Sequence, residues 1–589
     1  MGIILRILFV FLSVLFAAVL ELNRNTLAGW VLFLLLLGGF PVLYKRFLTD
    51  QSWILRMLGF LLYPLLFAGI LFLSWPPVKN VPAVSVRHPD VTDPIETAYG
   101  TITGVYNKDH TVEVFAGIPY AAPPLGELRW RSPQDPSPWE GVLACDSFQP
   151  MSMQETSLPI VDSLTQIIGY HDYQISLDDN YRPPVSEDSL YLNIWKPVTE
   201  ETDLPVLVYI HGGSLQTGQP WYQDYSGEGF AKDGVITVNM GYRLGVFGFL
   251  AEEELLEAEG TTGNYGLLDQ IKALEWVQDN IRAFGGDPNN VTLVGESAGA
   301  VCVDALCVSP LAKGLFQRAI LESSTLSSVI PPHSFRRFDE ALASGRDLMN
   351  RYGCASLDEL RSLPAEQLVH EMYTQHHVTV DGYVLSDTPY ELRRNGVHNE
   401  SALLHGYNKE ESGPFIIFSR ASLSNYEEKL RTEFGDSWEK IKELYPASSD
   451  EEADRYWAEI YGAEFFNYSH YCLSRLAKEN GIPVYAYYFS KSNGRLSSWH
   501  SGELVYAFGV IPEHSTLYQE SDYELSRAMH TYWVNFAKTG NPNGDSLPEF
   551  REYGTASQLM EFGETTGLIE EPYLNLYDVF DAMQGFEAN

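Results

Sequence analysis

The feature that most constrains the fold is the pentapeptide Gly295-Glu296-Ser297-Ala298-Gly299 and its flanks. A β-branched run, residues 290–294, leads into it, and a run of small residues follows. Strand, tight turn and helix in that order form the setting in which Gly-x-Ser-x-Gly acts as a nucleophile elbow. Both glycines are required because a side chain at either position would collide with the neighbouring strand or helix. The sequence therefore predicts a strained Ser297 above a sheet, at a helix N-terminus that favours developing negative charge.

A second turn upstream has the composition of an anion-binding loop. Residues 205–210 are typical of a buried strand, and this strand ends at His211-Gly212-Gly213-Ser214. A glycine-rich turn after a strand leaves backbone N–H groups free to point into a cleft, where they can stabilise an oxyanion. The alternative is an ordinary strand-to-loop turn. We expect the donors to be the N–H groups of Gly213, Ser214 and Ala298.

A nucleophilic serine also needs a general base. The chain has 14 histidines, so spacing alone selects none of them. His500 is the best candidate because it lies in a loop of small residues, 497–503, directly before the start of an aromatic helix at residues 504–506. His376 and His377 are poorer candidates, since they precede the expected acid.

The acid that orients the base is less certain from the residues alone. In one known arrangement the chain order is serine, acid, histidine. Residues 403–406 resemble a strand end, and the loop that follows contains Glu410 and Glu411. Either glutamate could orient the histidine, and the alternative is that both belong to a solvated acidic loop.

Segments of strand and helix character alternate around the elbow: residues 206–210 and 291–294 as strands, 266–284 and 298–308 as helices. This alternation predicts an α/β fold, with a mostly parallel sheet and helices on both faces.

From about Glu96 to Asp578 the chain resembles the type-B carboxylesterase and cholinesterase-like family of α/β-hydrolases. Besides the elbow, the matching blocks are residues 115–120, 123–130, 187–193, 242–245, 263–270, 284–288, 380–382 and 533–543. The resemblance implies a large central sheet and a serine carboxylic-ester hydrolase that works through an acyl-enzyme intermediate without a cofactor. The family also includes catalytically inactive adhesion proteins, so a binding module is the alternative.

The resemblance also implies roles for single residues. The family pattern Gly-x-Asn-x-x-Glu falls on residues 406–411, which makes Glu411 the acid. The pattern His-x-x-Glu-Leu falls on residues 500–504, which makes His500 the base. Because Ser297, Glu411 and His500 are all present, an active enzyme is favoured over a binding module.

The chain departs from the family in several places. Ser214 replaces the third glycine of the oxyanion turn, and Ser189 replaces the cysteine expected after Glu-Asp. No cysteine lies where the loop partner of Ser189 should be, so the 5 cysteines are expected to be free, mostly buried thiols. This pattern implies a bacterial member. Residues 179–182 lack the tryptophan that binds choline in cholinesterases, which favours a general carboxylesterase.

The first part of the chain has a different composition. Residues 3–20, 27–44 and 53–75 are apolar runs close to the ~20 residues needed to span a bilayer. A cleaved signal peptide is the alternative for the first run, but no small-x-small site precedes Glu21 and two further runs follow. The basic residues Arg6, Lys45 and Arg46 predict a cytoplasmic N-terminus. Three crossings then put the remainder on the periplasmic or extracellular side of the cell membrane.

These patterns predict a membrane anchor at 1–80, a tether at 81–95 and an α/β-hydrolase domain at 96–589. The formal net charge of -38 argues against nucleic acid as a partner. No metal-ligand spacing, phosphate loop or dinucleotide fingerprint is present in the sequence, so neither a metal nor a cofactor is predicted. The expected partners are a small ester substrate and the lipid bilayer, and the oligomeric state is left open.

Overall fold

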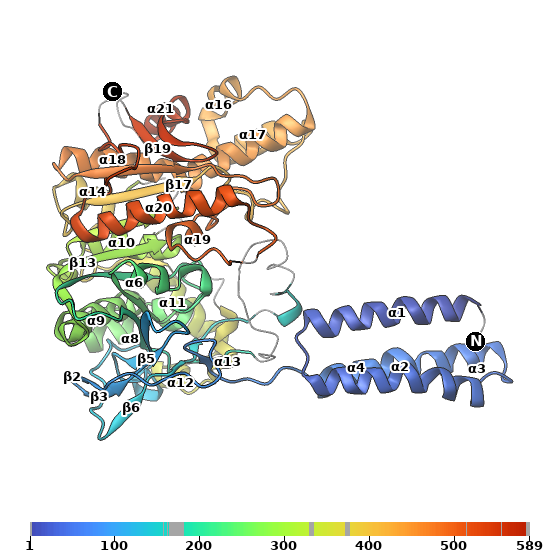
Figure 1. Cartoon of the computed structure of the whole chain (residues 1–589). Coiled ribbons are helices and arrows are strands. Elements are labelled where there is room, and N and C mark those ends of the chain that lie inside the picture. Colours follow the sequence, from blue (N-terminus) through green and yellow to red (C-terminus); the bar gives the residue numbers. More distant parts are fainter. Residues whose placement is uncertain are drawn as a thin grey trace. The chain divides into compact units, whose positions relative to one another are not determined.

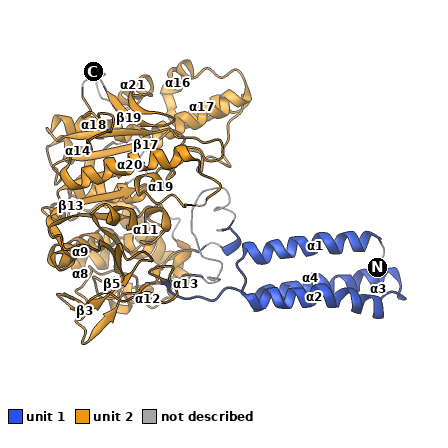
Figure 2. Ribbon diagram, in the orientation of Figure 1, with its two compact units in different colours: residues 1–81, 156–184 blue, residues 82–155, 185–589 orange. Residues whose placement is uncertain are grey.

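The computed structural model describes residues 3–156, 158–161, 163, 182–328, 335–371, 377–513, 515–554 and 557–584. The chain divides into two compact units (Figure 2). Unit 1 comprises residues 1–81 and 156–184, and unit 2 comprises residues 82–155 and 185–589. The inclusion of residues 156–184 in unit 1 was not expected from the sequence.

Unit 1 contains the apolar helices α1 (Ile3–Leu22), α2 (Leu27–Phe47), α3 (Trp53–Phe60) and α4 (Leu62–Leu73). Three segments, Ile3–Leu22, Leu27–Phe47 and Trp53–Leu73, are long and apolar enough to cross a membrane. Aromatic rings form the core of the unit: Phe16 stacks on Phe67 at 3.9 Å, and Tyr63 packs against Phe40 at 4.9 Å. The exposed leucine, isoleucine and valine side chains face outward, as in a bundle surrounded by lipid.

Buried polar groups in unit 1 are hydrogen-bonded to one another. The Asn25 amide donates to Ser74 Oγ at 2.7 Å and to the Leu71 carbonyl at 2.8 Å, which ties the loop between α1 and α2 to the end of α4. Ser13 Oγ and Tyr63 Oη lie 2.8 Å apart, between α1 and α4. Polar groups inside a bilayer need hydrogen-bond partners within the protein, because lipid chains provide neither donors nor acceptors.

Unit 2 is built on one large sheet. In the described residues it has 11 strands in the order β20-β19-β18-β17-β14-β13-β11-β12-β10-β5-β4. The central pairings, from β12 across to β19, are parallel, and the pairings at both edges are antiparallel. The strands are β4 (Val105–Tyr106), β5 (Val112–Pro119), β10 (Tyr191–Pro197), β11 (Leu204–Ile210), β12 (Ile236–Met240), β13 (Gly286–Glu296), β14 (Arg318–Glu322), β17 (Leu403–Asn408), β18 (Val484–Phe489), β19 (Gln558–Phe562) and β20 (Thr566–Glu570).

Both faces of this sheet are buried. In β11, Val206 and Val208 belong to one hydrophobic cluster, whereas Leu207 and Tyr209 belong to another. Successive side chains of a strand point to opposite faces, so the two clusters lie on opposite sides. Helices α9 (Tyr265–Asn280) and α10 (Ala298–Val308) contribute to the first cluster, and α19 (Leu504–Ala507) and α20 (Glu520–Thr539) to the second (Figure 1). The predicted mostly parallel sheet with helices on both faces is confirmed.

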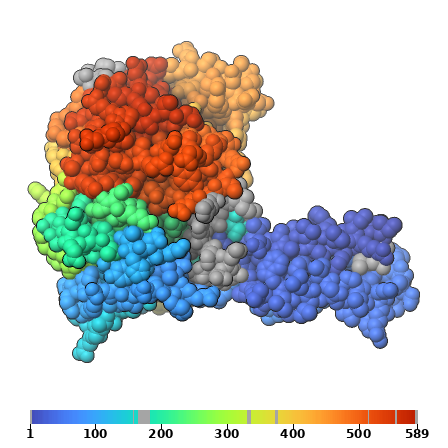
Figure 3. All heavy atoms as spheres, viewed as in Figure 1, coloured from blue at the N-terminus to red at the C-terminus, as the bar shows by residue number. Residues whose placement is uncertain are grey.

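The remaining elements extend this core. The helices are α6 (Glu228–Lys232), α7 (Gly245–Phe249), α8 (Glu253–Glu259), α11 (Phe338–Tyr352), α12 (Leu357–Arg361), α13 (Ala365–Leu368), α14 (Pro389–Arg394), α15 (Tyr426–Phe434), α16 (Trp438–Leu444), α17 (Asp450–Gly462), α18 (Tyr468–Glu479) and α21 (Leu574–Met583). The short strands are β1 (Val81–Pro82), β2 (Ile95–Thr97), β3 (Gly100–Thr103), β6 (Val142–Ala144), β7 (Ser147–Phe148), β8 (Met151–Ser152), β9 (Val185–Ser186), β15 (Phe335–Arg337) and β16 (Val378–Val380). On the face of unit 2 that Figure 3 shows, the C-terminal part of the chain, coloured orange to red, forms one continuous region of the surface.

The stretch expected to be a tether is partly bonded to unit 2. The N–H of Ala83 donates to the Asp146 carbonyl at 2.9 Å, and the N–H of Thr92 donates to the Gly104 carbonyl at 3.0 Å. The division between the units falls at Val81, next to the predicted boundary at residue 80. The three-part division of the chain stays a prediction.

Candidate active site

Ser297 forms the junction between β13 and α10. Its backbone has φ +56° and ψ −127°, a conformation that residues with a Cβ rarely adopt. The surrounding chain holds the strained residue on both sides: its N–H donates to the Glu322 carbonyl of β14 at 2.9 Å, and its carbonyl accepts from the Val301 N–H at 3.0 Å. The serine is thus fixed at the end of a central strand and directly before the first turn of a helix.

The two glycines of the elbow allow this geometry. A Cβ on Gly295 would lie 2.4 Å from the carbonyl carbon and oxygen of Gly299, and a Cβ on Gly299 would lie 2.0 Å from the Ile210 carbonyl of β11. Neither distance is tolerable for a carbon atom. The structure therefore shows the close approach of strand and helix that the sequence predicts.

The glycine-rich turn after β11 lies against the elbow. A Cβ on Gly212 would be 3.0 Å from Ser297 Cβ and 2.6 Å from the Glu296 carbonyl. Gly213 and Ser214 both have positive φ, +104° and +58°, and their N–H groups donate to no other described residue. Ala298 is the first residue of α10, so its N–H lies outside the helical hydrogen-bond ladder. Three donors therefore occur on the two segments that adjoin Ser297.

The serine at position 214, where the family has glycine, adds backbone strain to the turn. A residue with a Cβ at φ +58° carries roughly 1 kcal/mol of backbone strain. The side chain is exposed, so it meets no crowding that would prevent this conformation.

The loop after β17 brings Glu411 to His500. Glu411 Oε2 lies 2.6 Å from His500 Nδ1, and Oε1 accepts the Asn408 N–H at 2.7 Å. Both side chains are buried, whereas Glu410 is exposed, and its hydrogen bonds to described residues are made by the backbone: its N–H donates to the Ser498 carbonyl at 3.0 Å and its carbonyl accepts the Gly413 N–H at 3.1 Å. Of the two glutamates that the sequence left open, Glu411 is the one that contacts the imidazole. His377 lies beside β16, where burial lowers its pKa to about 4, and His376 lies outside the described residues.

The other imidazole nitrogen remains free for chemistry. His500 Nε2 is buried and forms no hydrogen bond with any described residue, Ser297 Oγ included. A carboxylate oxygen, Glu296 Oε1, lies 3.3 Å from it. The structure thus joins His500 to Glu411 and the glycine-rich turn to Ser297, but it contains no hydrogen bond between serine and histidine. Such bonds are often long in a free enzyme and tighten when substrate is bound.

Three further buried carboxylates near His500 were not singled out from the sequence. Glu296 Oε1 accepts from Ser501 Oγ at 2.6 Å. Glu503 accepts from Ser323 Oγ at 3.0 Å and from the Asn408 amide. Glu322 accepts from the Trp533 indole N–H at 2.8 Å. Glu296 lies within the elbow and Glu503 within the histidine motif, so their positions in those motifs were a usable signal. Glu322 had no such signal.

These charges shift the titration of the site. Burial lowers the pKa of His500, but Glu296 and then Glu411 outweigh it, and the pKa is raised to about 9. Burial raises the pKa of Glu503 to about 8, with Glu296 and Glu411 adding to the effect. Burial likewise raises the pKa of Glu296, against the pull of His500. The arrangement therefore stabilises a positively charged imidazolium, the species that forms when a histidine accepts a proton from a nucleophile.

Aromatic rings cover the imidazole. The ring centroids of Phe415 and Phe466 lie 5.1 Å and 4.7 Å from that of His500. Phe466 belongs to a π-helical turn, Ala463–Asn467, and such turns recur at functional sites. The rings restrict access of water to the base, which strengthens its electrostatic interactions.

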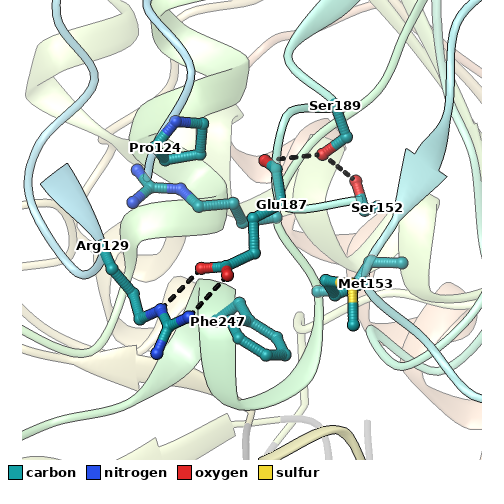
Figure 4. A pocket seen from close by; sticks show the side chains of 9 residues that line it. Pro124, Arg129, Ser152, Met153, Glu187, Ser189 and Phe247 are labelled. Carbon is teal, nitrogen blue, oxygen red and sulfur yellow. Dashed lines mark hydrogen bonds and ion pairs between the residues drawn. The ribbon is translucent and has the colours of Figure 1, made fainter. Parts of the chain in front are cut away.

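A small cavity lies in another part of unit 2 (Figure 4). Arg129 and Glu187 form a two-pronged ion pair in it, at 2.6 and 2.5 Å, and the third nitrogen of Arg129 donates to the carbonyls of Arg361 and Leu363. Ser152 Oγ donates to Ser189 Oγ at 2.9 Å. The charges of Arg129 and Glu187 are already paired with each other, so we interpret the cavity as a structural feature of the fold and not as a ligand site. Ser189 thus has a hydroxyl, that of Ser152, as a hydrogen-bond partner.

Among the described residues, neither the cysteines nor the possible metal ligands form a second candidate site. Cys145, Cys302, Cys307 and Cys472 are free and buried, and Cys354 is free and half-buried. No group of three or more His, Cys, Asp or Glu side chains is arranged to hold a metal ion within the part of the chain that the structure describes. Residues 179–181, where a choline-binding tryptophan was sought, lie outside that part.

Comparison with known proteins gives this site its context. The chain matches the carboxylesterase family over residues 92–578. It is 32% identical over 515 residues to carboxylesterase 1C of Rattus norvegicus, covering 81% of this chain and 91% of that protein. It is also 32% identical over 492 residues to the fumonisin B1 esterase of Sphingopyxis macrogoltabida, covering 80% of this chain and 86% of that one.

The fold is similar to that of solved esterases. The crystal structure of the carboxylesterase Est55 of Geobacillus stearothermophilus has a TM-score of 0.69 and 31% sequence identity, covering 83% of this chain and 100% of that one. A PNB esterase has a TM-score of 0.70 and 28% identity, covering 83% of this chain and 99% of its own. The chain therefore belongs to the carboxylesterase family; it is a carboxylic ester hydrolase with the α/β-hydrolase fold.

Proposed function

We propose that the protein is a membrane-anchored serine carboxylesterase in which Ser297 is the nucleophile. Ser297 Oγ attacks the ester carbonyl carbon while its proton passes to His500 Nε2. The N–H groups of Gly213, Ser214 and Ala298 donate to the oxyanion of the tetrahedral intermediate. When the intermediate collapses, the carbon–oxygen bond to the alcohol breaks, and the alcohol leaves with the proton from Nε2. Water then attacks the acyl-enzyme in the same way, releases the carboxylic acid and restores the serine.

The observation that carries this proposal is the contact between Glu411 and His500. A carboxylate 2.6 Å from Nδ1 fixes the proton on that nitrogen and leaves Nε2 as the basic atom. The buried Nε2 has no hydrogen bond to any described residue, so in the neutral form of the ring it is available to accept a proton. The strained Ser297 and the adjacent Gly212 turn supply the other two requirements, a fixed nucleophile and anion donors.

The test is covalent labelling. A fluorophosphonate probe should add one adduct to the full-length protein, and peptide mapping should locate it on Ser297. Ser297→Ala should abolish labelling and lower kcat for a p-nitrophenyl ester by at least about 10³-fold. Ser309→Ala, at the other end of α10, should behave as wild type. Labelling elsewhere contradicts the mechanism, and no labelling favours the inactive binding module.

The anchoring part of the proposal rests on the three candidate membrane spans of unit 1. We further propose that the N-terminus is cytoplasmic and that the esterase domain faces the periplasmic or extracellular side. The positive charges of Arg6, Lys45 and Arg46 support this orientation. Protease added to intact spheroplasts should digest the esterase domain, whereas protection of that domain would reverse the topology.

A further inference from the structure

Exposed apolar side chains gather beside the candidate site. Among the described residues of unit 2, Phe415, Ile417, Phe418 and Leu423 are 43%, 55%, 102% and 49% exposed. They lie within nine residues of one another in the chain, whereas the other exposed large apolar residues of the unit are scattered along the sequence. Exposed apolar side chains this close together in the chain are costly on a surface that faces only water, and such groups commonly mark an interaction site. We name residues 412–419 the apolar loop.

The backbone of the apolar loop is held by local hydrogen bonds. The N–H groups of Phe415 and Ile416 donate to the Ser412 carbonyl at 2.9 and 3.2 Å, and the Ser419 N–H donates to the Ile416 carbonyl at 2.8 Å. Ile416 is buried between its exposed neighbours. The loop is therefore a folded turn anchored by one side chain, and this anchoring leaves Ile417 and Phe418 exposed.

The apolar loop begins directly after the candidate catalytic acid. Glu411 precedes it, and Phe415 packs its ring on His500 while part of the same ring remains exposed. Phe418 follows Phe415 by only three residues, so a short stretch of chain joins the exposed part of the loop to the ring that covers the imidazole.

Charge narrows the choice of partner. Residues 412–419 contain no ionisable side chain, and the next residue, Arg420, is paired with Asp454 at 2.7 Å. The protein has a formal net charge of -38, which disfavours an acidic surface as the partner. A cation beside the loop, Lys429, donates to Ser419 Oγ at 2.8 Å, so the exposed side chains of the loop offer apolar contact, which suits the interface of a zwitterionic bilayer.

A bilayer lies within reach of unit 2 if unit 1 spans it. The last candidate span ends at Leu73, and the Ala83 N–H is already bonded to Asp146 in unit 2. The intervening residues, 74–82, extend over at most about 30 Å. If unit 1 spans the bilayer, this short connection keeps Ala83, where unit 2 begins to form hydrogen bonds, within that distance of the end of the last span.

We propose that the apolar loop inserts Ile417 and Phe418 into the interface of the bilayer that holds unit 1, so that lipophilic esters dissolved in that bilayer pass to Ser297 without crossing water. This inference rests on the proposed function, and it adds the substrate class, esters with long acyl chains. The aromatic and branched side chains of the loop are those that favour the headgroup region of a membrane.

The first experiment compares two substrates on the full-length protein in phosphatidylcholine liposomes. Ile417→Ser and Phe418→Ser should lower turnover of p-nitrophenyl palmitate dissolved in the bilayer by roughly tenfold. Turnover of water-soluble p-nitrophenyl acetate should be unchanged. Val142→Ser, which removes a 57% exposed side chain from β6, is the matched control and should affect neither. Equal loss on both substrates, or no loss on either, overturns the proposal.

The second experiment detects insertion without using activity. An environment-sensitive fluorophore is attached to Phe418→Cys in a Cys354→Ser background, with Val142→Cys as the control. Lipids that carry a nitroxide on the acyl chain should quench the probe at position 418 and not at 142. A probe that is shielded but unquenched means that a second copy or another segment of the chain covers the loop, and it overturns the proposal, as does a fully solvated probe. If wild type hydrolyses neither ester, the proposed function fails. The quenching measurement still shows whether the apolar loop inserts into the bilayer.

Discussion

Two carboxylates approach opposite nitrogens of one imidazole in this site. Glu411 is 2.6 Å from His500 Nδ1 and Glu296 is 3.3 Å from Nε2. Both favour the charged ring, so both raise the pKa of His500 despite its burial. The same charges would stabilise the imidazolium in the proposed transition state, and they reduce the fraction of neutral His500 at neutral pH.

This balance predicts the pH dependence of the enzyme. A general base works only when it is neutral, so kcat/KM should rise with pH through the pKa of His500, about 9, and level off above it. Glu296→Gln removes one negative charge beside Nε2, which lowers that pKa and moves the rising limb to lower pH. The measurement is kcat/KM for p-nitrophenyl acetate between about pH 6 and 10. A limb that stays in place in the variant would show that Glu296 is uncharged in the free enzyme.

A second prediction separates the neighbouring glutamates. Glu411→Gln keeps the size of the side chain but removes the charge that fixes the proton on Nδ1, and it should lower kcat by about 10³- to 10⁴-fold. Glu410→Gln changes an exposed side chain and should leave kcat within about twofold. Steady-state kinetics on purified variants with matched thermal unfolding decide between them. Similar losses for both variants would contradict the assignment.

The sequence could not choose between these two residues on its own. Glu410 and Glu411 are adjacent in a loop without periodicity, so nothing local shows which side chain is buried. Only the family motif selected Glu411. Glu322 was missed for a related reason. It reaches the site through the parallel pairing of β14 with β13, a contact between distant parts of the chain.

At the level of elements, the elbow was the most predictable part of the molecule. The predicted helix 298–308 coincides with α10, and the predicted strands 206–210 and 291–294 lie within β11 and β13. Steric demands at two glycines fix this geometry, and such demands can be read from a sequence. The third apolar run is less regular than expected. It forms α3 and α4, which meet at Leu61, because Pro64 clashes with the carbonyl four residues earlier, at Phe60.

The oxyanion turn provides a prediction at this scale. Ser214→Gly relieves the strain of φ +58° and preserves the N–H group, so kcat should stay within about threefold. The gain from the relieved strain is partly offset by the greater freedom of glycine in the unfolded chain, so Tm should rise by only about 1 °C. Enzyme kinetics and differential scanning calorimetry measure the two effects. A large loss of kcat would instead show that the serine side chain contacts the substrate.

For the whole molecule, the change from apolar runs to the catalytic blocks predicted a boundary at residue 80, and the two compact units divide at Val81. Residues 156–184 also group with unit 1, and nothing in their composition indicates it. Among the described residues, Arg24 donates to Ser163 Oγ and the Lys79 N–H donates to the Arg182 carbonyl, contacts between distant parts of the chain that local patterns do not encode.

This division predicts that the esterase activity survives removal of the helices. A protein that begins at Pro82 retains the Ala83–Asp146 hydrogen bond and every residue of the candidate site. It should remain in the supernatant after ultracentrifugation and hydrolyse p-nitrophenyl acetate within about threefold of full-length protein in detergent, because unit 2 has its own large core. The full-length protein should sediment with membranes and resist carbonate extraction. A folded but inactive truncated protein would mean that unit 1 helps to build the site.

The hydrogen bond between Ser152 and Ser189 has a consequence for how the protein matures in a cell. Two hydroxyls make the contact at 2.9 Å, and all five cysteines are free. The esterase domain can therefore complete its fold without an oxidant or a thiol isomerase, and a reducing cytosol and an oxidising exterior are equally suitable for it. The absence of disulfides therefore sets no redox requirement on the side of a membrane at which the domain folds.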